Sequence, residues 1–286
     1  MVLSDPESGI GHRMPHLARP PIFGNKNALA AGRWDIGARA HRGFGGLPIL
    51  DRLSVSPHFR ASEFGALASE ARAALDRAAT YRLLGPNEFI YLQEDEAHHL
   101  YFVRSGHVRL SYLLEDGSPI LFGVLPPGES FGELGIFEGG RHADMATSIG
   151  TSSIWCIPAA AFRNLRAQYP ELDLALARTV ARRYRSYILL TRILGLKTLP
   201  ARLSQCLLRV ADGLDDRTLH GNRDVLQVGA FVTQSDLGLM ARGARGNVNR
   251  ALKAWEREGW IAMRDRNILI LDRMSLESVA IDDGFD

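Results

Sequence analysis

Hydrophobic and polar positions alternate in short runs through the middle of the chain. Between residues 81 and 158 these runs are rich in β-branched and aromatic residues and are separated by turn signals. Asp116-Gly117 lies between two alternating runs, and an Asp-Gly pair in that position is typical of a β-hairpin. Several short strands at this spacing predict an antiparallel barrel or sandwich.

The segment before this region follows the helical period. Residues 60–79 are rich in alanine, and Leu67, Ala71 and Leu75 fall on one side of a helix. Residues 1–50 mix Gly, Pro, Arg and His with scattered apolar residues and show no sustained period, which predicts a flexible N-terminal arm.

A long helix is expected after the strands, over residues 171–196. Its apolar stripe repeats at alternating steps of four and three residues, the spacing of a coiled-coil seam. The stripe consists of Val180, Tyr184, Tyr187, Thr191 and Leu194. Either a partner helix or the chain's own barrel could cover it. We favour a symmetric dimer. A two-fold pair of these helices would also set the distance between the C-terminal helices of the two copies. Thr198 followed by Pro200 marks the start of the next helix.

Residues 232–257 carry the most informative pattern. Thr233 is expected to cap a short helix with Asp236 in its first turn, and Arg242-Gly243-Ala244 supplies a turn into a second helix. The first helix should bury Leu237 and Met240. The apolar face of the second consists of Val248, Ala251, Leu252 and Trp255. Two helices around such a turn are typical of a DNA-binding helix-turn-helix, and residues 262–272 predict a short two-stranded wing after it.

Basic charge is concentrated on the second of these helices. Residues 241–257 contain four Arg, one Lys and one Glu, whereas the whole chain has a formal charge of only +2. In the major groove, Arg can form two hydrogen bonds with the edge of guanine, and Asn can do the same with adenine. The residues expected to contact double-stranded DNA are Thr233, Gln234, Arg242, Arg245, Asn247, Asn249, Arg250 and Lys253. The alternative is a solvated basic helix face.

Composition narrows the class of protein. With 286 residues and 46% hydrophobic content, the chain is long enough for two domains. It has no run of 18 apolar residues and no basic-then-apolar leader, so we expect a cytoplasmic protein without a membrane partner. Cys156 and Cys206 lie in apolar contexts typical of buried thiols, and no metal site is expected. The sequence shows neither a catalytic Ser/His/Asp set nor a Walker loop, which argues against an enzyme.

Three segments together resemble the Crp/Fnr superfamily of bacterial transcription factors, over about residues 60–275. They are LYFVRSGHVRL, PGESFGELGIFEGGRHADMAT and VTQSDLGLMARGARGNVNRALKAWEREGWI. The resemblance implies an α+β fold with an antiparallel jelly-roll β-barrel of the cyclic-nucleotide-binding type at 51–170. A dimerisation helix at 171–197 and a winged helix-turn-helix at 198–286 would follow. It also implies a homodimer on a palindromic operator, with RNA polymerase as a further partner.

The middle segment contains the parts of a nucleotide pocket. Gly132 permits close backbone approach, Glu133 can accept from a sugar hydroxyl, and Arg141 suits a phosphate. The resemblance implies that Glu133 meets the ribose and Arg141 the cyclic phosphate. The candidate ligand-binding residues are Gly132, Glu133, Leu134, Arg141, His142, Ala143 and Tyr187.

Departures from the family pattern keep the effector open. His142 stands where the family has Ser or Thr, the loop before Arg141 is short, and Tyr187-Ile188 replace two hydroxyl residues that face the base. We expect a homodimeric transcription regulator that is gated by a small effector bound in the barrel, and candidate effectors are cAMP, cGMP or a cyclic dinucleotide. The alternative is a constitutive or partner-controlled regulator with a vestigial pocket.

In the helix-turn-helix, Gly246 replaces the usual Glu, so the target sequence should differ from the common half-site.

Overall fold

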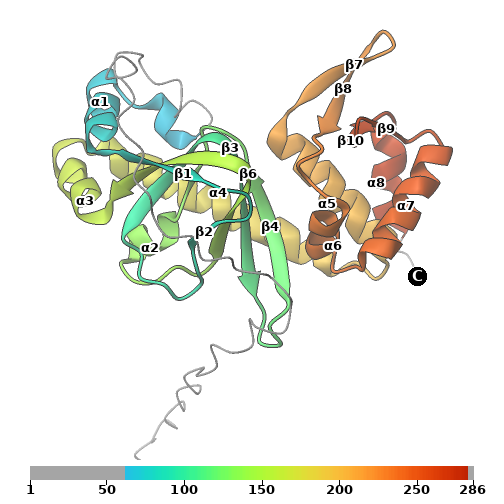
Figure 1. Cartoon of the computed structure of the whole chain (residues 1–286), viewed down its shortest axis with the longest axis horizontal. Coiled ribbons are helices and arrows are strands. Elements are labelled where there is room, and N and C mark those ends of the chain that lie inside the picture. The colour runs from blue at the N-terminus through green and yellow to red at the C-terminus, as the bar shows by residue number, and fades with distance from the viewer. Residues whose placement is uncertain (1–61, 283–286) are drawn as a thin grey trace, which may run out of the picture. The chain divides into compact units, whose positions relative to one another are not determined.

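The computed structural model describes residues 62–282. The arm expected over residues 1–50 lies outside the described residues, as do residues 51–61 and 283–286. The described chain combines an N-terminal β-barrel, a long helix and a C-terminal module of helices with a small sheet (Figure 1). This arrangement confirms the predicted α+β fold.

Six antiparallel strands form the barrel. They are β1 (Thr80–Leu84), β2 (Phe89–Tyr91), β3 (His99–Leu113), β4 (Pro119–Leu125), β5 (Ser130–Phe131) and β6 (Met145–Pro158). The order in the sheet is β1-β6-β3-β4, with β2 paired to β6 and β5 to β3. The Asp116-Gly117 hairpin joins β3 to β4 as predicted, and Gly117 takes a φ of 78°, which glycine adopts readily.

Helices cover one part of the barrel. Helix α1 (Ser69–Ala78) and helix α3 (Ala159–Gln168) lie side by side (Figure 1). The prediction of one helix over 60–79 was wrong in its first half, since a 3-10 turn η4 (Glu63–Ala66) precedes an extended Leu67 and Ala68. The break is stabilised by Arg72, which donates to the carbonyls of Gly65 (3.2 Å) and Leu67 (2.7 Å) and so satisfies groups that a continuous helix would have paired.

Helix α4 (Glu171–Leu194) matches the predicted long helix, but its exposed stripe has another phase. Tyr187 packs against Phe122 with ring centroids 4.8 Å apart, and Leu194 also packs on the barrel core. Two of the five residues expected in a dimer seam therefore face the chain's own barrel. The exposed positions at steps of three and four are Leu174, Ala177, Ala181, Tyr184, Ile188 and Thr191.

The C-terminal module begins at helix α5 (Leu199–Leu214), which Thr198 caps by accepting from the backbone N–H of Ala201. Its other elements are β7 (Arg217–His220), β8 (Arg223–Val228), α6 (Gln234–Ala241), α7 (Arg245–Arg257), β9 (Ile261–Arg264), β10 (Asn267–Ile270) and α8 (Arg273–Asp282). The strands pair in the order β7-β8-β10-β9. The predicted wing is thus β9–β10, and the sheet is extended by a β7–β8 hairpin that the sequence did not suggest.

Candidate functional site

Helix α6 begins with the cap that the sequence predicted. The hydroxyl of Thr233 accepts from the backbone N–H of Asp236 (3.1 Å), and the Asp236 carboxylate accepts from the backbone N–H of Thr233 (2.8 Å). This capping box fixes where the chain enters the helix, and it leaves the side chains of Thr233 and Ser235 exposed.

The turn between α6 and α7 depends on close backbone contact. A Cβ on Gly238 would lie 2.5 Å from the carbonyl oxygen of Gly243, so only glycine lets the turn close on α6. Arg242 takes a left-handed φ of 50° at the end of α6. These two residues set the crossing of the two helices.

Helix α7 exposes the polar face that the sequence predicted. Val248, Leu252 and Trp255 are buried beneath it. Exposed residues at the turn and on α7 are Arg242, Arg245, Asn247, Arg250 and Lys253. Asn249 is half-buried and accepts from the amide of Gln234 (3.3 Å), which ties α7 to the start of α6. Arg250 donates to the side chain of Asn247. All eight predicted DNA-contact residues therefore belong to α6, its N-terminal cap, α7 or the turn between the two helices.

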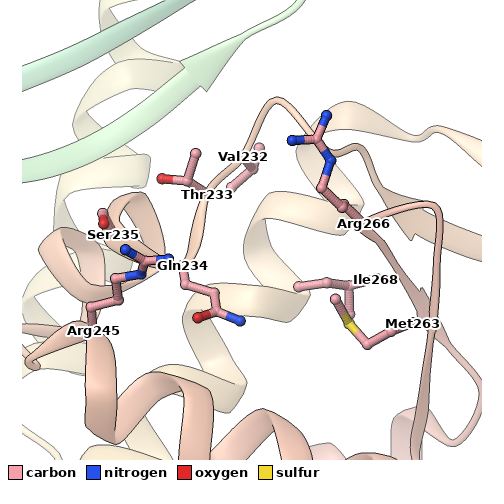
Figure 2. Close-up of a pocket in the computed structure, with 8 residues that line it drawn as sticks. All are labelled: Val232, Thr233, Gln234, Ser235, Arg245, Met263, Arg266 and Ile268. Carbon is pink, nitrogen blue, oxygen red and sulfur yellow. The ribbon is translucent and has the colours of Figure 1, made fainter.

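A groove lies between these helices and the wing. Figure 2 shows Thr233, Ser235 and Arg245 on one side of it and Arg266 on the other. Arg266 belongs to the two-residue turn between β9 and β10, in which Asp265 and Arg266 have φ values of 52° and 66°. The groove therefore has a cation on each side, an arrangement that suits a polyanion. Sequence reasoning missed Arg266 as a site residue, although the charged triplet between the two predicted strands was a usable signal.

The other candidate site is the barrel segment around α2 (Glu133–Glu138). Glu133 is buried, and one of its carboxylate oxygens accepts from Nε of Arg183 on α4 at 2.9 Å. Arg183 also donates to the carbonyl of Ser130 (2.9 Å). Burial by itself would lower the pKa of the guanidinium, but the neighbouring Glu133 carboxylate outweighs that effect and holds the pKa above its ordinary value. Glu133 is thus one half of a buried ion pair. Sequence reasoning missed Arg183 because a single Arg in a basic helix gives no sign of burial.

Aromatic rings fill the space beside Gly132. The imidazole of His142 is 1% exposed and stacks on Tyr91, with centroids 3.6 Å apart and planes 9° apart. A Cβ on Gly132 would lie 2.9 Å from the ring of Tyr101 and 3.3 Å from His142. The Tyr91 hydroxyl donates to the buried carboxylate of Asp144 at 2.9 Å. The space on the Cβ side of Gly132 is therefore occupied by this chain's own side chains.

Of the remaining predicted ligand residues, Tyr187 lies close enough to Asp144, Arg183 and Glu133 for their charges to act on it. Arg141 is exposed, and its guanidinium donates to the carbonyl of Glu94. Ala143 is exposed, Leu134 is half-buried, and Tyr187 packs on Phe122 in the barrel core. The structure brings Gly132 and His142 together, and it engages Glu133 with Arg183 rather than with Arg141.

Two buried groups in this cluster have opposite pKa shifts. Burial lowers the pKa of His142 from 6.5 to about 4. Burial, reinforced by the Glu133 carboxylate, raises the pKa of Asp144 from 3.8 to about 6. Between pH 6.5 and 4 the unfolded chain gains a proton at His142 that the folded chain refuses, which destabilises the fold. Over nearly the same range the folded chain gains a proton at Asp144 that the unfolded chain refuses, which stabilises it. The two contributions oppose each other.

Removing either group should reveal the pH dependence of stability that the remaining group causes. We expect the stability of Asp144→Asn to fall by about 2–3 kcal/mol relative to the parent as pH drops from 6.5 to 4, and that of His142→Phe to rise by a similar amount. Urea unfolding at several pH values measures both. Parallel pH curves for the parent and the two variants would contradict the assignment.

Comparison with known proteins gives the family. Residues 81–169 match the family model described as the cyclic nucleotide-binding domain, and residues 201–279 match the Crp-like helix-turn-helix domain. A relative from Thermus thermophilus, the transcriptional regulator LdrP, is 30% identical over 193 residues, which cover 68% of this chain and 93% of the relative. The chain belongs to the Crp/Fnr family of transcription regulators.

Another relative and two solved structures are also similar to this chain. A CRP-like cAMP-activated global transcriptional regulator from Mycobacterium tuberculosis is 29% identical over 200 residues, covering 68% of this chain and 88% of the relative. The structure of a Crp-family transcriptional regulator from Thermus thermophilus, TTHB099, has a TM-score of 0.55 and 28% identity, covering 70% and 96% of the two chains. FixK2 from Bradyrhizobium japonicum shares the fold at 23% identity, with a TM-score of 0.61 and coverage of 70% and 96%.

The Crp/Fnr relatives are transcription regulators and not enzymes. Cys156 and Cys206 are free and buried, as predicted, and burial raises their pKa values to about 11 and about 12. Within residues 62–282, no helix combines the length and apolar character needed to cross a membrane. The same residues hold no cluster of three metal-ligating side chains.

Proposed function

We propose that this Crp/Fnr regulator is a homodimer that binds a palindromic operator through α7. The observation that carries the proposal is the exposed face of Arg245, Asn247 and Arg250 beside a groove bounded by the wing. The proposed domains are the barrel over 51–170, the dimerisation helix over 171–197 and the DNA-binding module over 198–286. We place the regulator in the cytoplasm, with RNA polymerase as a further partner and no membrane partner.

Two classes of DNA contact follow from the geometry. Arg245, Asn247 and Arg250 lie on the exposed face of α7 and can reach base edges, with Asn249 and Lys253 beside them. Thr233, Ser235 and Arg266 line the rim of the groove and suit phosphate oxygens. Base contacts should set the sequence preference, whereas rim contacts should set affinity and salt dependence.

Arg250→Ala and Arg266→Ala should therefore fail in different ways. We expect Arg250→Ala to cost about 1–3 kcal/mol of binding free energy and to relax the preference at one base pair of each half-site. Arg266→Ala should weaken binding to all sequences alike and reduce the salt dependence by about one counterion per protomer. Fluorescence anisotropy on a selected operator and its single-base variants, at several salt concentrations, separates the two effects.

Arg163→Ala is a matched control, because Arg163 is exposed on α3 and lies outside the DNA-binding module. It should bind like the parent. If Arg250→Ala kept both the affinity and the sequence preference of the parent, α7 would not read the operator in the proposed register.

For the barrel, the contacts favour a regulator that does not depend on a cyclic nucleotide. His142 and the tyrosine rings occupy the space beside Gly132, Glu133 is held by Arg183, and Arg141 is turned to the Glu94 carbonyl. A nucleotide bound in the family's manner would have to unstack His142 and redirect Arg141, and both changes cost free energy. Several relatives are described as cAMP-activated, which makes cAMP the first nucleotide to test.

The test is operator binding with and without added nucleotide. We expect the affinity to be unchanged by cAMP, cGMP or cyclic di-GMP, and the thermal unfolding midpoint to be unchanged as well, because a ligand that binds only the folded state would raise it. Arg141→Ala should behave like the parent in both assays. An increase in operator affinity with any of these nucleotides, abolished in Arg141→Ala, would return the effector-gated function to first place.

The dimer in this proposal is formed by α4. Its exposed face contains Leu174, Tyr184 and Ile188, which are 53%, 64% and 43% exposed, together with the small residues Ala177 and Ala181. These positions follow one another at steps of three and four, the pattern that a second α4 would cover. We therefore assign this face to a second copy of the chain, with both DNA-binding modules on the same side of the helix pair.

A further inference from the structure

The barrel holds the DNA-binding module through one nearly buried ion pair. Arg109 on β3 donates from Nε and Nη2 to the two carboxylate oxygens of Asp236, at 2.7 and 3.1 Å. The two side chains are only 17% and 6% exposed. Asn87 accepts from the remaining Nη1 at 3.0 Å. A two-bonded Arg–carboxylate pair fixes both distance and orientation, which a single surface ion pair does not.

The carboxylate that Arg109 binds already has a local role. Asp236 belongs to the capping box of α6 and accepts from the backbone N–H and the hydroxyl of Thr233, at 2.8 and 2.7 Å. Arg109 is therefore not needed to start α6. It attaches the barrel to the helix end that carries Thr233 and Ser235, two residues that line the DNA groove.

Further contacts from strands β3 and β4 support this attachment. His107, two residues before Arg109, stacks on Phe231 in the segment before α6, with centroids 3.7 Å apart and planes 17° apart. On β4, Leu121 packs into the apolar core of the module, and the carbonyl of Phe122 accepts from Arg209 on α5 at 2.6 Å. The barrel thus contacts the module at α6, at the segment before it and at α5.

The covalent connection between the two parts is short. Only residues 195–198 separate the end of α4 from the start of α5. A single short connection lets one body turn about it, and a second attachment away from that axis removes the rotation. The Arg109 contact leaves Thr233, Ser235 and Arg245 exposed, so it does not cover the DNA groove.

We propose that Arg109 is a positioning residue that fixes each DNA-binding module against its own barrel and thereby selects the spacing of the two operator half-sites. The inference rests on the proposed function, because it requires a dimer on a two-part operator. Two modules held at a set separation bind matched half-sites without losing rotational freedom at the moment of binding. Loosely attached modules lose rotational freedom when they bind, which lowers the affinity. They also bind half-sites at other separations.

The experiment compares Arg109→Ala and Arg109→Lys with the parent on palindromes whose central spacing is lengthened or shortened one base pair at a time, and on a single half-site. For Arg109→Ala we expect about a tenfold loss at the best spacing, a flatter dependence on spacing, and unchanged affinity for the half-site. Arg109→Lys keeps the charge but not the two-bonded geometry, so it should recover part of the preference. Arg77→Ala, an exposed Arg on α1, is the matched control and should behave like the parent.

A second measurement does not depend on DNA. Spin labels on Glu138→Cys in the barrel and Glu258→Cys in the module, both exposed positions, report the distance between the two parts within one protomer when labelled protein is diluted with unlabelled protein. Arg109→Ala should broaden this distance distribution. An unchanged distribution, an unchanged spacing profile or a gain in operator affinity would each overturn the role of Arg109. A parent protein that shows no spacing preference would instead contradict the proposed dimeric function, while the distance measurement would still decide the attachment.

Discussion

Arg183→Met is expected to lower the free energy of unfolding by about 3–5 kcal/mol, because it leaves the Glu133 carboxylate buried without its cation. Both side chains of the pair are at most one-tenth exposed. The variant also removes the donor to the Ser130 carbonyl, which joins α4 to strand β5. Chemical denaturation followed by circular dichroism measures the loss.

The second half of this test removes both charges. Glu133→Gln combined with Arg183→Met should recover most of the lost stability, because a neutral amide costs far less to bury than an unpaired carboxylate. Arg163→Met on α3 is the matched control, since Arg163 is exposed, and it should change stability by less than about 0.5 kcal/mol. If Arg183→Met were no less stable than Arg163→Met, water would have to reach Glu133 in the folded protein.

The features that could be predicted from the sequence are those determined by near neighbours. The capping box needs only Thr233 and Asp236, three residues apart, and the structure forms it. The hairpin at Asp116-Gly117 and the cap at Thr198 are similarly local. The buried face of α7 follows from helical spacing alone. Most of the proposed DNA-contact surface could therefore be predicted from the sequence alone.

The features that were missed depend on contacts between distant segments. Arg183 meets Glu133 across 50 residues of chain, and Arg109 meets Asp236 across 127. Neither arginine differs in its local sequence from the many exposed ones. The same limit applies to the pocket, where His142 marked a departure from the family pattern, but only the fold shows that it stacks on Tyr91.

The phase of α4 shows why helical spacing alone did not identify which apolar face of the helix is exposed. The helix is apolar on two faces, one against the barrel and one exposed, and both repeat at steps of three and four. The predicted stripe ran through Tyr184 and Thr191, which are exposed, but also through Tyr187 and Leu194, which pack on the barrel. Only the position of the barrel shows which face is buried and which is exposed. The exposed face contains Ile188, so we expect the dimer contact there.

Ile188→Glu is therefore expected to dissociate the dimer and to abolish tight binding to a palindrome. In a parallel two-fold helix pair each Ile188 would face its counterpart, so the variant would place two like charges together in an apolar seam. We expect the dimer dissociation constant to rise at least about a hundredfold, whereas affinity for a single half-site should remain near that of the parent. Sedimentation equilibrium and fluorescence anisotropy measure the two quantities.

A charge-matched mixture makes the test specific to this position. Ile188→Lys should also dissociate the homodimer, but Ile188→Glu and Ile188→Lys mixed in equal amounts should form a heterodimer, because opposite charges then meet across the seam. The mixture should regain binding to a palindrome that neither variant binds alone. Arg163→Glu, an exposed change of charge on α3, should leave the dimer intact. A full dimer of Ile188→Glu alone, or a mixture that fails to recover while both variants remain folded, would place the dimer contact on another face of the chain.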